Sequence, residues 1–220
     1  MVTIKLRCPS CYNECGFTIT CLDGYENIKE ITLAGKTHQL VHAHCLCKCP
    51  NCKQVVLAKI ETTLANYQNI QEALKNFQYT PPLSFIKILE YWPKPPEPYS
   101  HESLPDDLKI LYKDLQEILW LKKSPSIVIG GCRSVLECAL KELGAEGKSI
   151  RDKIDDLFNK GVITKSLANW ALHIRIEGNI AIHEIKATPE EANEIVEFIK
   201  IFLIYTFELP HRIKLLYPEA

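Results

Sequence analysis

From about residue 104 onward, apolar residues recur at the three- and four-residue spacing of an amphipathic helix. This spacing predicts five helices, over residues 105–123, 126–143, 148–161, 165–185 and 188–209. Gly144 and Gly161 close the second and third helices, and Thr188 with Glu191 forms a capping box at the start of the last. The fourth helix is apolar nearly all round, so it is the expected central helix.

The first part of the chain has a different pattern, typical of short strands. The stretches GFTITCL (16–22) and QVVLAKIETT (54–63) are rich in β-branched residues and are flanked by turn-forming residues. Residues 65–79 favour a short helix, and SFIKILEYW (84–92) is compatible with a strand. Five prolines within residues 93–105 predict a linker of polyproline character.

Cysteine usage identifies the strongest candidate site. Eight of the ten cysteines lie within the first 52 residues, and four of them form the matched pairs CPSC and CPNC. Each pair places two thiolates on a tight turn, so two facing turns predict a tetrahedral site with no position open for catalysis. The predicted cofactor is structural zinc, and its predicted ligands are Cys8, Cys11, Cys49 and Cys52.

Other Cys and His residues in the same region could hold a second metal. They are Cys15, Cys21, Cys45, Cys47, His38, His42 and His44. The alternation in HQLVHAHCLC (38–47) is equally typical of a half-buried strand, and cysteine is a common small core residue. Both interpretations stay open from the sequence.

These patterns predict a mainly α protein in which a small N-terminal β zinc ribbon precedes a bundle of about five helices. The predicted domains are a zinc ribbon at 1–64, a connecting segment with a Pro-rich linker at 65–103, and a helical domain at 104–220.

Composition narrows the classes of function. The net charge is −1, so no global basic field attracts nucleic acid. No apolar run reaches the roughly 18 residues of a membrane helix, and the N-terminus lacks the pattern of a signal peptide. The sequence therefore predicts a cytoplasmic protein with no membrane partner.

The string RIEGNIAIH contains the strongest candidate residues outside the cysteine cluster. Arg175, Asn179 and His183 are spaced four apart, so they form one slanted row on an otherwise apolar helix. Arg133 and Glu137 are a second pair four apart and could form a supporting polar network with this row. Either the five residues satisfy one another in a core, or the row lines a site. In such a site His183 is an acid or base and Arg175 stabilises a phosphate.

The order of these motifs resembles the bacterial domain-of-unknown-function family 4145. The likeness is carried by the paired cysteines, YWPKPPEPYSHESLPDDLKILYKDL, CRSVLECAL, SIRDKIDDLFNKGVI and HIRIEGNIAIHE. The resemblance implies a HEPN-like helical domain, which is often dimeric, and an association with mobile-element or anti-phage defence systems.

Many HEPN proteins are ribonucleases whose motif is an Arg, a polar residue, three more residues and a His. Asn179 and His183 match the end of this motif, but its Arg position is Gly178, and Arg175 lies about one turn earlier. The resemblance implies an interaction or nucleic-acid-sensing accessory protein. Its alternatives are a metal-independent ribonuclease using His183 and a structural adaptor to a larger nuclease or helicase. The expected partners are a second copy in a homodimer, RNA or DNA, and a larger defence-system protein.

Overall fold

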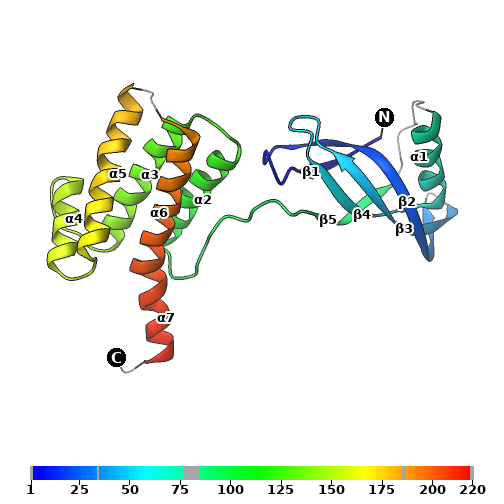
Figure 1. Ribbon diagram of the computed structural model, residues 1–220. Helices are drawn as coiled ribbons and strands as arrows, with labels where there is room; N and C mark the ends of the chain where they lie inside the picture. Colours follow the sequence, from blue (N-terminus) through cyan, green and yellow to red (C-terminus); the bar gives the residue numbers. More distant parts are fainter. Residues whose placement is uncertain (1, 34, 77–84, 185–186, 219–220) are drawn as a thin grey trace. The chain divides into compact units, whose positions relative to one another are not determined.

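The chain forms two compact units, Met1–Pro96 and Glu97–Ala220. The computed structural model describes residues 2–33, 35–76, 85–184 and 187–218, apart from the side chains of residues 33, 36 and 175–184. Figure 1 shows a sheet with one helix in the first unit and a group of helices in the second.

The first unit is built on a five-stranded antiparallel sheet whose strands lie side by side in chain order. They are β1 (Thr3–Arg7), β2 (Glu14–Leu33), β3 (Lys36–Lys48), β4 (Val55–Thr63) and β5 (Ile86–Trp92). The Tyr91 hydroxyl on β5 donates to the backbone carbonyl of Arg7 on β1 at 3.1 Å. The two edge strands therefore approach each other, and the sheet is a half-barrel.

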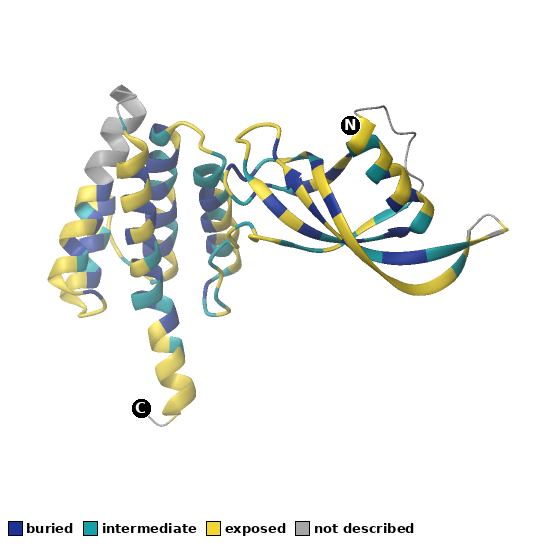
Figure 2. Cartoon of the chain, turned by 45° about the vertical axis from the view of Figure 1, so that its right-hand side comes forward, coloured by how far each residue is buried: buried dark blue, intermediate teal, exposed yellow. Residues whose placement is uncertain are grey.

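Alternation along the strands places one face of the sheet in a core. On β3, His44 and Leu46 are exposed, whereas every second side chain is buried, at Val41, Ala43, Cys45 and Cys47. Helix α1 (Leu64–Asn76) packs onto the same core through Tyr67 and Ile70. The region 38–47 is thus a half-buried strand, as one of its two interpretations predicted (Figure 2).

The second unit is helical. Its elements are α2 (Asp106–Trp120), α3 (Pro125–Glu142), α4 (Ile150–Asn159), α5 (Lys165–Glu184), α6 (Pro189–Leu203), the π-helical turn η1 (Ile204–Glu208) and α7 (Leu209–Leu216). Helix α3 contacts α2, α4, α5 and α6, so it is the central helix in place of the expected α5. A Cβ built on Gly131 of α3 would lie 2.8 Å from the side chain of Leu115, so this glycine permits a close approach of α2.

Helix α6 begins with the predicted capping box and continues without a break into η1 and α7. The Thr188 amide donates to the Glu191 carboxylate at 2.8 Å, and the Glu191 amide donates to the Thr188 hydroxyl at 3.2 Å. Pro210 has no amide hydrogen to give to the preceding turn, and the helix widens into the π-helical turn just before it.

The expected fold class, mainly α with a small β ribbon, is wrong. Strands β2 and β3 alone are 20 and 13 residues long, and α1 and β5 belong to the first unit rather than to a connecting segment. On β2, residues 23–30 are all exposed, so no hydrophobic alternation marks this half of the strand. The helical unit also continues past the five predicted helices into α7.

Candidate metal centre

Two equivalent turns carry the paired cysteines. In the first, the Cys8 amide donates to the Asn13 carbonyl at 2.9 Å, and the Tyr12 amide donates to the Cys8 carbonyl at 3.0 Å. The second turn repeats both bonds around Cys49, at 2.8 and 3.1 Å. The first turn joins β1 to β2 and the second joins β3 to β4, so the strand pairing brings them to the same end of the sheet.

The turns also share an unusual backbone conformation. Tyr12 and Lys53 each follow the second cysteine of a pair, and their φ angles are 58° and 67°. This left-handed region is costly for residues other than glycine. Two non-glycine residues in the same strained position indicate that the surrounding structure fixes both turns.

The four predicted ligands come together in one cluster. Their sulfur atoms all lie within 4.8 Å of one another, with Cys8 and Cys52 at 3.4 Å and Cys11 and Cys49 at 3.9 Å. Around zinc, with Zn–S bonds of about 2.3 Å, tetrahedral geometry places sulfurs about 3.8 Å apart. Cys52 is exposed and the other three are buried. The spacing and the all-sulfur donor set therefore fit a zinc ion.

Fixed amides stabilise thiolates in this cluster. Burial acts to raise the pKa of Cys49, but the backbone amides of its own turn, together with the thiols of Cys52 and Cys8, hold that pKa below its ordinary value. Burial is likewise outweighed at Cys11, where the backbone and side-chain amides of Asn13 lower the pKa to about 7. At Cys8 burial prevails and raises the pKa to about 12. A metal ion binds thiolates, so stabilised thiolates are what a metal ligand set requires.

The residues considered for a second metal do not form one site. Cys45 and Cys47 lie on the buried face of β3, with sulfurs 3.5 Å apart. The alternate positions hold the two histidines: His44 is exposed and His42 contacts the Glu61 carboxylate at 3.2 Å. In the part of the chain that the structure describes, the Cys8 cluster is the one group of three or more close metal-binding side chains.

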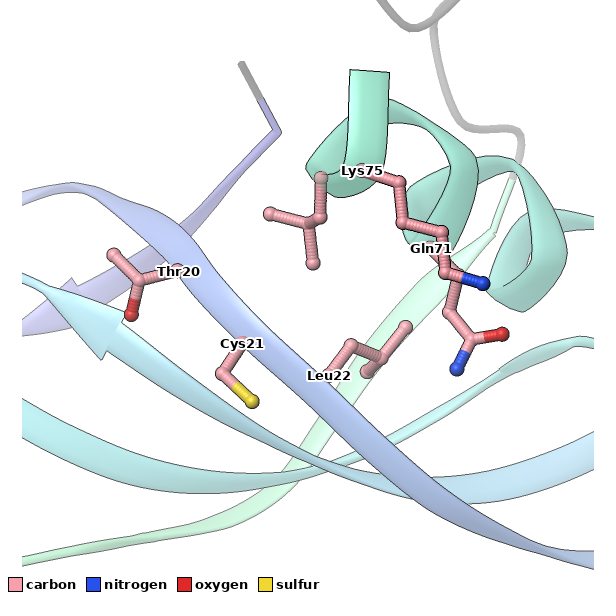
Figure 3. Close-up of a pocket in the computed structure, with 6 residues that line it drawn as sticks. Thr20, Cys21, Leu22, Gln71 and Lys75 are labelled. Atoms are coloured by element: carbon pink, nitrogen blue, oxygen red, sulfur yellow. The ribbon is translucent and has the colours of Figure 1, made fainter. Parts of the chain in front are cut away.

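Cys15 and Cys21, both on β2, have very different surroundings. The Cys15 sulfur lies 3.9 Å from that of Cys49. Burial is the main cause that raises the pKa of Cys15 to about 11, and the neighbouring Cys49 thiol adds to it. Cys21 is exposed and lines a hollow of about 210 Å³ together with Gln71 and Lys75 of α1 (Figure 3). Sequence spacing alone gave no sign of the contact between Cys15 and the cluster.

The other candidate row falls largely outside the described side chains. Arg175, Asn179 and His183 lie in the last turns of α5, where only the backbone is described. Arg133 is half-buried on α3, and Glu137, one turn later, is exposed. The polar network and the catalytic role of His183 therefore stay predictions.

Comparison with known families concerns the helical unit. Residues 116–218 match the family described as Domain of unknown function (DUF4145), which supports that family for the region from the end of α2 through α7. The match does not extend to the cysteine cluster. No curated protein and no solved structure matches the chain. Among the described helices, none has both the length and the apolar character needed to cross a bilayer.

Proposed function

We propose that this chain is a zinc-stabilised interaction protein. Zinc holds the two cysteine turns of the first unit, and the helical unit joins two copies of the chain. The observation that carries the proposal is the closed cluster of four sulfurs, all within 4.8 Å of one another. Four thiolates complete the zinc shell and leave no position for a substrate, so the metal stabilises structure and takes no part in catalysis.

Metal analysis tests the first part of this proposal. The purified full chain is expected to contain about one zinc per chain, and Cys49→Ser, which removes a buried ligand, is expected to lose it. Cys138→Ser is the matched control because Cys138 is a half-buried cysteine on α3. Because zinc binding contributes to folding free energy, Cys49→Ser should also lower the thermal midpoint of the first unit. Metal-free protein with the control's midpoint would contradict a structural metal.

Exposed apolar side chains on α7 support assembly through the helical unit. None of the residues of α7 is buried, and all of them are described. Figure 2 shows this helix almost entirely in the colour of exposed residues. An apolar patch there comprises Leu209, Ile213 and Leu216, which share one face of the helix and are 44 to 73% exposed.

A second copy of the chain is the occupant that we propose for this patch. In a two-fold symmetric dimer the same surface of each copy faces that of the other, so the α7 patch of one copy buries the α7 patch of the second copy. Exposed apolar patches of this kind are typical of interaction sites, and a stable dimer needs at least about 1,000 Å² of buried surface. The apolar side chains of the patch favour a protein contact.

Light scattering at high micromolar concentration tests the dimer. Wild type is expected to be a dimer, and Ile213→Glu is expected to be a monomer because it places a charge in the contact. Ile127→Glu is the matched control, since Ile127 is 61% exposed on α3 and outside the patch. A monomeric wild type, or equal dissociation of both variants, would show that α7 does not form the contact.

The cellular setting that we propose is a cytoplasmic accessory of defence or mobile-element systems. The family resemblance of the helical unit supports this setting. If the chain acts as an adaptor, its further partner is a larger nuclease or helicase. The cysteines of the described residues are free, which agrees with a reducing compartment.

A further inference from the structure

The metal cluster has a fifth sulfur. Cys15 stands at the start of β2, and its sulfur lies 3.9 Å from the sulfur of Cys49. Four ligands complete a tetrahedral shell, so Cys15 keeps a thiol that is not bound to metal but touches a sulfur that is. Cys15 is partly exposed, whereas Cys49 is fully buried. Cys52 is more exposed but belongs to the proposed ligand set, so Cys15 is the accessible sulfur beside the cluster that keeps a free thiol.

We propose that Cys15 is a site of oxidative modification, where a peroxide joins Cys15 to Cys49 and thereby releases the metal. This inference rests on the proposed function, because it regulates the same cluster. The two sulfurs come from neighbouring strands, Cys15 from the start of β2 and Cys49 from the turn that follows β3. The two sulfurs need to move from 3.9 Å to a bond of about 2.05 Å, a closure of about 1.9 Å.

The reaction takes place in two steps. The Cys15 sulfur attacks hydrogen peroxide, the O–O bond breaks, and the thiol proton passes to the leaving hydroxide, so that the products are Cys15 sulfenic acid and one water. The Cys49 thiolate then attacks the sulfenic sulfur, an S–S bond forms, and hydroxide leaves. Peroxide gains two electrons, and each sulfur loses one.

Loss of Cys49 opens the metal shell. A Cys49 sulfur held in the disulfide would no longer be available as a metal ligand. Three thiolates remain at Cys8, Cys11 and Cys52, so the ion is held less tightly and can depart. A thiol reductant restores both cysteines and hence the full ligand set.

The test follows zinc release from the zinc-loaded full chain after addition of hydrogen peroxide. A chromogenic chelator reports the rate, and peptide mapping without reductant identifies the disulfide. The variants are Cys15→Ser and the control Cys21→Ser, which removes an exposed cysteine on the same strand beside α1 (Figure 3). Wild type and the control are expected to release zinc equally and to contain a Cys15–Cys49 disulfide. Cys15→Ser is expected to release zinc at least about fivefold more slowly.

Two results would overturn the inference. One is release from Cys15→Ser at the wild-type rate. The other is a disulfide between Cys8 and Cys52, whose sulfurs are 3.4 Å apart. If the purified chain holds no zinc, the proposed function fails separately. Peptide mapping of the peroxide-treated, metal-free chain then still tests the inference. Absence of the Cys15–Cys49 disulfide from that chain would contradict it.

Discussion

Replacing Tyr99 with Phe removes one hydroxyl that ties the beginning of the helical unit to its end. This hydroxyl donates to Oε2 of Glu208, whose side chain is only 10% exposed, and Arg212 holds the other carboxylate oxygen. A hydrogen bond to a charged group contributes about 1.5–3 kcal/mol. Because Arg212 still partners the carboxylate, we expect Tyr99→Phe to lower the free energy of unfolding by about 1.5–2 kcal/mol.

Urea unfolding of the full chain, followed at the helical transition, measures this cost. Tyr112→Phe is the matched control because the Tyr112 hydroxyl donates to a neutral acceptor, the Val196 carbonyl, at 3.2 Å. Loss of a neutral hydrogen bond is expected to cost about 0.5–1.5 kcal/mol. If Tyr99→Phe costs no more than Tyr112→Phe, the charged acceptor contributes nothing and the reasoning is refuted.

Acid provides a second check on the same hydrogen bond. The Tyr99 hydroxyl, aided by Arg212 and opposed by burial, holds the pKa of Glu208 below its ordinary value. The pKa of an unfolded Glu is about 4.3, so the stabilisation is complete above about pH 4.3 and is lost as pH falls through the lower folded pKa. The difference between wild type and Tyr99→Phe should therefore narrow in acid. A cost that stays constant from about pH 7 to about pH 2 would rule out the carboxylate as its source.

Two further substitutions test local features of the helical unit by urea unfolding. Thr188→Ala removes the capping hydroxyl of α6 and should cost about 1 kcal/mol, whereas an unchanged midpoint would mean that the cap adds no stability. Ile154→Ala empties a fully buried position on α4 and should cost about 2–5 kcal/mol. Ile110→Ala, at a position that is 61% exposed, should stay within about 0.5 kcal/mol, and equal costs at the two positions would contradict the assigned core.

The helices could be predicted from the sequence because their signals are local. Thr188 and Glu191 lie within one turn of each other, and the apolar spacing of α6 repeats over its whole length. The second half of β2 has no such signal, because residues 23–30 are exposed on both faces and their pairing with β3 is the main feature that makes them a strand. The central position of α3 likewise depends on contacts with four other helices, which no single segment encodes.

The candidate site divides in the same way. The CPSC and CPNC turns are short motifs whose spacing indicates metal ligands, and the structure brings their four sulfurs together. The approach of Cys15 to Cys49 could not be predicted, because it arises from the pairing of β2 with β3. This pairing brings together two residues that are 34 positions apart in the chain. The exposed apolar patch on α7 lies mostly beyond the last predicted helix, so periodicity did not reach it.

The pairing of β2 with β3 also sets the order in which the cluster can assemble. Leu33 pairs with Lys36 at one end of this ribbon, and Thr18 pairs with Lys48 at the other, next to both cysteine turns. Pairing that spreads from Leu33 and Lys36 requires only short loop closures, and it brings the two cysteine turns to the same end of the sheet. The length of the ribbon therefore sets how far its Leu33–Lys36 end lies from the cysteine turns. An insertion of paired residues into both of its strands would lengthen it and leave the geometry of the four ligands unchanged.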